Sequence, residues 1–162
     1  MPLPAIRPLS DADHAAWIGL RQALWMGSDE TTKAAEDGTL LRDPRRFGAL
    51  RYAVLLAFEG ERAVGFVEVS LRDDLPSRSG RKVGYVEGIY VAPTSQRRGL
   101  ARALIEAAAA FVRHEGADEL TTEVMPDNGP GLDFHRRVGF AVIGESGDSG
   151  RQVLLARSAR QA

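Results

Sequence analysis

A β-rich segment runs directly into a long amphipathic helix near the middle of the chain, and this junction constrains the fold most. Residues 89–91 (Ile-Tyr-Val) favour a strand, Pro93 ends it, and helical spacing of apolar residues begins at Leu100. The backbone must therefore turn sharply between Gln96 and Gly99. The first turn of a helix has unpartnered N–H groups and the positive end of the dipole, so the turn predicts an anion site.

The residue pattern of this turn does not match the common nucleotide-binding loops. Residues 96–101 read Gln-Arg-Arg-Gly-Leu-Ala, which is neither the phosphate loop that ends in Gly-Lys-Ser/Thr nor the dinucleotide-binding Gly-x-Gly-x-x-Gly. Taken alone, one glycine in a basic turn also fits an ordinary strand-to-helix connection with solvated arginines. A specific assignment therefore needs the rest of the chain.

Composition narrows the class of protein. With 162 residues and 44% hydrophobic residues, the chain suits one globular domain over residues 1–162. A formal net charge of −1 gives no global basic field for nucleic acid. The absence of cysteine excludes disulfides, cysteine-based metal sites and an acyl-cysteine intermediate. No stretch resembles a leader or a membrane span, so we expect a cytoplasmic protein without a membrane partner.

The hydrophobic patterns predict alternating strands and helices. Strands are expected at 5–9, 52–58, 63–71, 83–92, 119–125, 140–144 and 152–156, and helices from Ser10 and at 100–112 and 126–138. The polar segment 28–47 is expected to hold one or two short helices and to form a wall of a substrate cleft. Residues 72–82 read as an exposed loop. The mixture indicates an α/β or α+β sheet covered by helices.

Several motifs together resemble the GCN5-related N-acetyltransferases (GNAT). Residues 96–101 resemble their pyrophosphate loop, and the resemblance extends to Asp127-Asn128, to residues 134–140 (Phe-His-Arg-Arg-Val-Gly-Phe) and to the order of elements. It implies the GNAT fold, a central mixed, mostly antiparallel sheet of roughly six to seven strands flanked by about four helices. It also implies acetyl-coenzyme A as cosubstrate and no metal.

In the resembled fold the pantetheine arm of the cofactor lies between two splayed strands and pairs with one of them like an added strand. The resemblance places this arm along Ile89 and Val91, and Asn128 would offer an amide to it. Asn128 equally reads as a helix cap beside Asp127. The implied cofactor-binding residues are Ile89, Tyr90, Val91, Gln96, Arg97, Arg98, Gly99, Leu100, Ala101, Asn128 and His135.

His135 stands where many relatives carry a tyrosine that contacts or protonates the leaving thiolate. A histidine has an unperturbed pKa of about 6.5 and can act as a general acid near neutral pH. The alternative is a partly buried histidine that packs on the cofactor without a proton role. The departure from tyrosine puts acid catalysis at this position in doubt.

Acetylation of an amine requires a neutral nitrogen, so a carboxylate must receive the proton of the ammonium. Glu87, on the expected central strand just before the cofactor loop, is the first candidate base, acting through water. Glu123 on the neighbouring strand is the second. The alternative for both is a strand glutamate that faces solvent.

Within the superfamily the chain most resembles the aminoglycoside 6'-N-acetyltransferases, through residues 20–25, 65–72, 86–91 and 134–140. A polycationic sugar suits an acidic cleft with an aromatic floor. The candidate substrate-binding residues are Trp25, Asp73, Asp74, Glu87, Glu123 and Glu145. Trp25 equally reads as a core residue on the stripe of Trp17. Leu75 in place of a tyrosine and Glu123 in place of an aspartate depart from the pattern.

The resemblance implies direct attack of a primary amine on acetyl-coenzyme A in a ternary complex, with the carbonyl polarised by a strand amide near Ile89. The missing cysteine disfavours a ping-pong route. A homodimer is expected because such enzymes pair through their C-terminal strands, with the apolar residues 153–156 covering a sheet edge. The alternatives are another acceptor (a polyamine, amino acid or protein amine) and a protein that binds acetyl-coenzyme A or an aminoglycoside without turnover.

Overall fold

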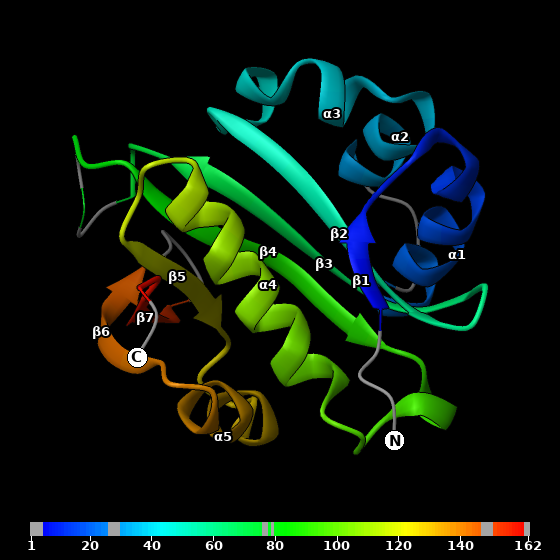
Figure 1. Ribbon diagram of the computed structural model, residues 1–162. Helices are drawn as coiled ribbons and strands as arrows, with labels where there is room; N and C mark the ends of the chain where they lie inside the picture. Colours follow the sequence, from blue (N-terminus) through cyan, green and yellow to red (C-terminus); the bar gives the residue numbers. More distant parts are fainter. Residues whose placement is uncertain (1–4, 26–29, 76–77, 79, 147–150, 161–162) are drawn as a thin grey trace.

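One seven-stranded sheet organises the computed structural model, which describes residues 5–25, 30–75, 78, 80–146 and 151–160. The strand order is β1-β2-β3-β4-β5-β7-β6 (Figure 1). The strands are β1 (Ala5–Pro8), β2 (Arg51–Glu59), β3 (Arg62–Arg72), β4 (Val83–Val91), β5 (Glu119–Val124), β6 (Ala141–Ser146) and β7 (Gln152–Ser158). Neighbouring strands are antiparallel except for β4 and β5, which are parallel. The predicted mixed, mostly antiparallel sheet is confirmed.

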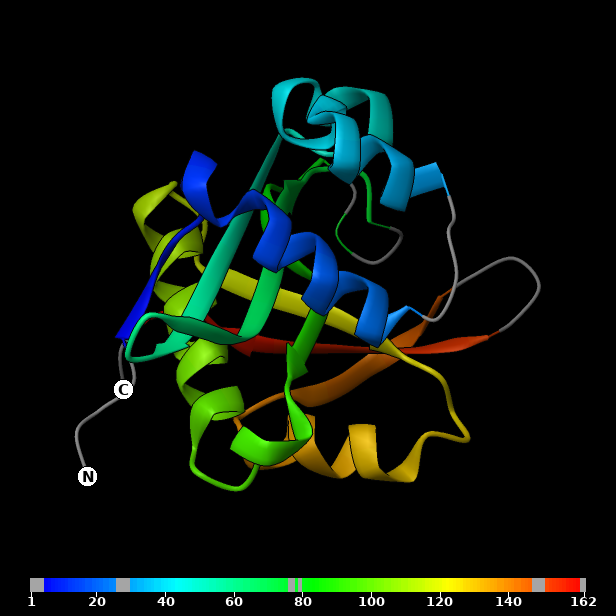
Figure 2. The same cartoon turned by 90° about the vertical axis from the view of Figure 1, so that its right-hand side faces the viewer.

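Helices cover both faces of this sheet. They are α1 (His14–Leu24), α2 (Glu30–Asp37), α3 (Thr39–Arg42), α4 (Leu100–His114) and α5 (Gly129–Arg137), with short 3-10 turns η1 (Asp11–Asp13), η2 (Pro44–Phe47) and η4 (Pro93–Ser95). α4 crosses one face of the sheet in Figure 1, and α1 to α3 lie on the other face, toward the viewer in Figure 2. Among the described residues, no helix combines the length and the apolar character needed to span a bilayer.

Each face has its own apolar core. The cluster under α4 contains the buried helix residues Leu104, Ile105 and Ala108 together with alternate residues of the central strands. The cluster under α1 to α3 contains Trp17 and Phe66. Residues of β3 alternate between the two clusters, as the period of a strand buried on both faces requires.

Helix α4 packs unusually close to the sheet at Gly84. A Cβ atom at this glycine would lie 2.2 Å from Cγ2 of Val112 and 3.1 Å from Cδ1 of Leu120. The contact lies at the end of β4 where the strand pairs with β5. That pairing covers Gly84–Leu120 and Tyr85–Thr121 alone among the described residues, and beyond it the two strands part.

A buried ion pair joins the α1 side to the sheet. Arg21 of α1 donates from Nε to Oε2 of Glu68 at 2.8 Å, and the two side chains are 2% and 0% exposed. Trp17 Nε1 and the Tyr52 hydroxyl also donate to Glu68, and Arg21 Nη1 donates to Thr32 of α2. The charges are therefore paired and hydrogen-bonded, as burial demands.

One sequence expectation differs from the structure. The apolar residues 153–156 were expected to cover a sheet edge, but β7, which contains them, lies between β5 and β6, and Leu154 and Leu155 are fully buried. The edge strand is β6. The last two strands were also expected to pair around Gly147 and Gly150, which lie outside the described residues.

We predict that Gly84→Ala destabilises the protein, because its Cβ would overlap Val112. Overpacking of this kind costs about 1–3 kcal/mol. Gly19→Ala is the matched control, since Gly19 lies in helix α1 with nothing within 4 Å of the added Cβ. This control should raise the unfolding free energy by up to about 1 kcal/mol. Chemical denaturation measures both, and equal stability of the two variants would contradict the close contact.

Candidate active site

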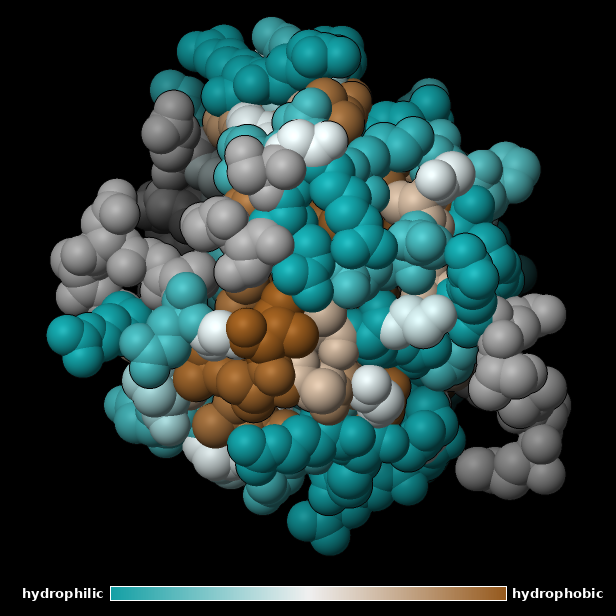
Figure 3. Space-filling model, turned by 90° about the vertical axis from the view of Figure 1, so that its left-hand side faces the viewer, coloured by the Kyte–Doolittle hydropathy of each residue, from teal (hydrophilic) through white to brown (hydrophobic). Residues whose placement is uncertain are grey.

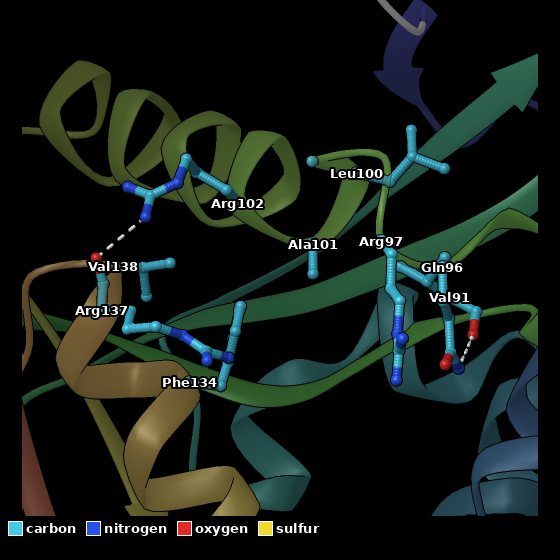
Figure 4. Close-up of a pocket in the computed structure, with 10 residues that line it drawn as sticks. Val91, Gln96, Arg97, Leu100, Ala101, Arg102, Phe134, Arg137 and Val138 are labelled. Carbon is cyan, nitrogen blue, oxygen red and sulfur yellow. Dashed lines mark hydrogen bonds between the residues drawn. The ribbon is translucent and has the colours of Figure 1, made fainter.

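A basic pocket opens where β4 leads into α4. Its volume is about 370 Å³. It is lined by Val91, Gln96, Arg97, Gly99, Leu100, Ala101, Arg102, Phe134, Arg137 and Val138. Figure 4 shows Gln96 and Arg97 on one side, Phe134 and Arg137 on the other, and Arg102 on α4 above. We call this site the basic pocket because three arginines line it.

The turn before the N-terminus of α4 directs backbone amides toward this pocket. Arg97 and Gly99 both have left-handed backbone conformations, with φ of 65° and 80°. The N-cap residue of α4 is Gly99, which has no side chain to cap the helix. Left-handed residues in a turn and a free helix N-terminus both turn successive N–H groups toward one point, where an anion binds.

Side chains brace the basic pocket from both walls. Gln96 Nε2 donates to the carbonyl of Val91 at 3.0 Å, which fixes the turn to the end of β4. Arg102 Nη2 donates to the carbonyl of Arg137 at 3.0 Å, which ties α4 to the end of α5 (Figure 4). Arg102 therefore both adds charge to the pocket and joins two of its walls.

Most of the predicted cofactor loop lines the basic pocket, and the rest of the predicted set does not. Val91, Gln96, Arg97, Gly99, Leu100 and Ala101 line it. Ile89 packs toward the α4 core, Tyr90 lies on the opposite face near Phe66, and Arg98 forms an ion pair with Glu59 at 3.2 Å. Arg102, Phe134, Arg137 and Val138 also line the pocket and are not among the residues predicted to bind the cofactor. Helical spacing from Gly99 was the one available signal for Arg102.

Asn128 acts as a helix cap in this structure. Its Oδ1 accepts a hydrogen bond from the amide of Gly131 at 3.0 Å, and α5 begins at the next residue. This is the second of its two sequence interpretations. Its side-chain oxygen is thereby occupied.

His135 is a buried residue of α5 and does not line the basic pocket. Its Nδ1 lies 2.7 Å from the carbonyl of Gly131, which only accepts, so Nδ1 carries the proton. The edges of Phe134 and Phe140 enclose the ring. Burial lowers the pKa of His135, opposed by the bond to Gly131. The neutral ring then presents Nε2 as an acceptor, and no described group bonds to that atom.

An acidic pocket of about 340 Å³ lies beside the parallel strands. It is lined by Arg72, Asp74, Leu75, Tyr85, Glu87 and Glu123. Both predicted base candidates therefore meet in one site, together with Asp74 from the predicted substrate set. Three carboxylates face one guanidinium there, so the pocket has a negative formal charge, which attracts cations.

A β-bulge directs Glu87 into the acidic pocket. Glu68 pairs with Gly88 and Val69 pairs with Val86, which leaves Glu87 as the extra residue of β4. A bulge re-aims the side chain at its position. Ser70 Oγ donates to Glu87 Oε2 at 2.6 Å, on the face of β3 that also presents Glu68 to α1.

Tyr85 is a pocket residue that the sequence analysis did not single out. Its hydroxyl donates to Glu123 Oε1 at 3.1 Å. Burial raises the pKa of Tyr85, and the neighbouring carboxylates Glu123 and Glu87 raise it further. The phenol therefore stays protonated and orients Glu123. Nothing in a local sequence pattern distinguishes this tyrosine from an ordinary strand residue.

Three predicted substrate residues lie outside the acidic pocket. Trp25 packs on β4, where a Cβ at Gly88 would lie 2.5 Å from its ring, and Arg21 stacks over it at 4.3 Å. Its core interpretation therefore fits better. Asp73 and Glu145 are exposed and do not line this pocket.

Comparison with known proteins identifies the fold and its relatives. The model of the acetyltransferase (GNAT) family matches residues 16–140. An aminoglycoside N(6')-acetyltransferase type 1 from Stenotrophomonas maltophilia is 37% identical over 138 residues, 85% of this chain and 86% of that protein. A protein of the same name from Klebsiella aerogenes is 30% identical over 144 residues, 88% of this chain and 92% of that protein.

Solved structures agree with these sequence relatives. The aminoglycoside N-acetyltransferase AAC(6')-Iy in complex with CoA superposes with a TM-score of 0.78 at 27% identity, covering 90% of this chain and 93% of that one. The same enzyme with a bisubstrate analogue, CoA-S-monomethyl-acetylneamine, gives a TM-score of 0.74 at 27% identity, covering 91% of this chain and 99% of that one. The family model and the relatives span most of the sequence, and the fold agrees with them: the chain belongs to the acetyltransferase (GNAT) family.

Proposed function

We propose that this protein transfers the acetyl group of acetyl-coenzyme A to a primary amine, the 6'-amine of an aminoglycoside, by direct attack in a ternary complex. One observation carries the proposal: a basic pocket and an acidic pocket adjoin the same strand, β4, where it parts from β5. Relatives with 37% and 30% identity are named as aminoglycoside acetyltransferases. The route requires no metal.

The basic pocket suits the pyrophosphate of coenzyme A. Free amides at the N-terminus of α4 and three arginines supply the donors. The open edge of β4 beyond Tyr85 leaves room for an extended arm to add to the sheet. AAC(6')-Iy, which has a similar fold, is solved in complex with CoA. A strand amide near Ile89 would then polarise the thioester carbonyl.

The acidic pocket suits a polycationic acceptor, whose ammonium must lose a proton before it attacks. We assign Glu123 as the base, because it lines the acidic pocket and the Tyr85 hydroxyl orients its carboxylate. Glu87 is held by Ser70 and Arg72 and serves to bind the cation. The base accepts the amine proton through water, the nitrogen forms a bond to the carbonyl carbon, and the C–S bond breaks to release the thiolate.

For His135 we propose the packing role rather than acid catalysis. The neutral ring with its proton on Nδ1 has no proton on Nε2 to give. The thiolate would then take its proton from solvent.

A cytoplasmic location, where coenzyme A thioesters are available, fits this chemistry, and the proposal needs no nucleic acid or membrane partner. We also propose a single domain, since both apolar cores share one sheet.

We predict saturable release of thiol from acetyl-coenzyme A with kanamycin, and a kanamycin product heavier by one acetyl group. Lysine peptides with a single ammonium group should react more slowly at matched concentrations, because the acidic pocket attracts several ammonium groups at once. Polyamines, which are also polycations, are the second comparison. Thiol detection measures the release of coenzyme A, and mass spectrometry measures the acetylated product. Turnover with the other amines alone would assign a different acceptor, and cofactor binding without any turnover would contradict the enzyme.

We predict that Glu123→Gln lowers kcat by about 10²- to 10⁴-fold, since loss of a general base has effects of that size. Glu87→Gln should chiefly raise the KM for the amine, because its carboxylate binds the cation. Glu61→Gln, in the exposed turn between β2 and β3, is the matched control and should leave both constants unchanged. Unchanged turnover in both pocket variants would show that the base lies elsewhere.

We also propose a homodimer that uses the β6 edge of the sheet. Figure 3 views the side on which β6 and β7 lie and shows an apolar patch there. Val142 of β6 is 48% exposed although it is a large apolar side chain on an edge strand. Such an edge is a liability unless it is covered.

Sedimentation equilibrium should therefore give about twice the 17.6 kDa of one chain. Val142→Arg should shift the protein toward the monomer, because it places a charge in the proposed interface. Arg62→Ala, in an exposed position on the opposite half of the sheet, is the control. A monomeric wild-type mass at micromolar concentration would overturn the dimer.

A further inference from the structure

Arg72 is the one cation among the described residues that line the acidic pocket. A guanidinium in a pocket for a polycation weakens the attraction for the substrate. Burial opposes the charge of Arg72, but Glu87 raises the pKa of this arginine, so it stays charged. Its place in the pocket therefore needs an explanation other than attraction of the acceptor.

The guanidinium of Arg72 uses all three of its nitrogens. Nε and Nη2 donate to Glu87 Oε2 at 3.0 and 2.6 Å. Nη1 donates to the carbonyl of Gly48 at 2.9 Å, and Nη2 also donates to the carbonyl of Phe47 at 3.3 Å. The side chain thus links β4 to the segment that follows η2.

Gly48 is shaped for this contact. Its φ of 79° is in the left-handed region, and a Cβ there would lie 2.8 Å from Nη1 of Arg72. A side chain at this position would therefore be strained and would also push the guanidinium away. The close approach of Arg72 to the carbonyl depends on the glycine.

The bonds leave the two oxygens of Glu87 in different states. Ser70 and Arg72 both bond to Oε2. No hydrogen bond to Oε1 of Glu87 is found among the described residues. One oxygen is held by three charge-assisted or hydroxyl donors, while the other keeps its acceptor capacity for a group in the pocket.

We propose that Arg72 is a positioning residue for the acceptor amine: it clamps Glu87 by Oε2 so that Oε1 meets the ammonium group, and it docks the wall at 44–48 against the same carboxylate. The inference rests on the proposed function. A lysine cannot replace it, because one ammonium nitrogen cannot span a carboxylate and two carbonyls in fork geometry.

The test compares Arg72→Lys and Arg72→Met with Arg78→Lys. Arg78 is the matched control because it pairs with Glu119 at 2.6 Å, as Arg72 pairs with Glu87 at 2.6 Å, and both pairs are partly buried. Neither Arg78 nor Glu119 lines the acidic pocket. Steady-state kinetics are measured with kanamycin and acetyl-coenzyme A, or with another amine that the wild type acetylates.

We expect kcat/KM for the amine to fall by about 10²-fold in both Arg72 variants, since misplacement by about 1 Å has effects of that size. The KM for acetyl-coenzyme A should stay within about twofold, because the basic pocket is untouched. Arg72→Lys should rescue little of the loss although it keeps the charge. The Arg78 variant should match the wild type.

A second readout needs no acceptor. Hydrogen–deuterium exchange of the amides at 45–50 should accelerate in Arg72→Met and in Gly48→Ala, which breaks the same clamp from its other side, but not in Arg78→Lys. Wild-type exchange in both clamp variants would overturn the proposal, as would full rescue by lysine or an equal rise in both KM values. Failure of kanamycin as a substrate with faster exchange at 45–50 would contradict the acceptor assignment and leave the clamp standing.

Discussion

The parting of two parallel strands is the constraint on which the site depends. β4 and β5 pair at Gly84 and Tyr85, where α4 presses closely on the sheet, and then diverge. A parallel pair needs a crossover helix, and that helix, α4, begins beside the diverging end of β4. The free amides at the N-terminus of α4 and the open edge of β4 therefore lie close together as a direct result of the strand–helix–strand connection.

The positively charged and the negatively charged parts of the site contact different helices around the sheet. The arginine-lined pocket adjoins α4 and α5, whereas Glu87 shares a face of β3 and β4 with residues that contact α1. The bulge at Glu87 makes this possible, because it turns two successive residues, Glu87 and Gly88, toward the same face. A regular strand would have sent one of them into the α4 core. The anionic cosubstrate and the cationic acceptor can thus approach β4 from different sides.

Local patterns predicted the fold well, because strand alternation, helical spacing and turn residues act over a few positions. The hairpin of β2 and β3 and the turn before α4 are confirmed, and most of the predicted cofactor loop lines the basic pocket. Arg72 and Tyr85 were missed because their roles come from partners 15 to 38 residues away. The bulge depends on register between strands, and the inner place of β7 depends on sheet order. Trp25 fitted two interpretations until its contact with Gly88 was known.

The buried pair of Arg21 and Glu68 makes helix α1 and strand β3 depend on each other. Exchange of α1 and α2 for the corresponding helices of a relative would leave Glu68 as a lone buried charge unless the incoming helix carried an arginine in register. Such a loss costs about 3–5 kcal/mol, a large share of the stability of a domain. Laboratory recombination of acceptor specificity in this fold is therefore restricted to crossover points that keep both partners of the pair.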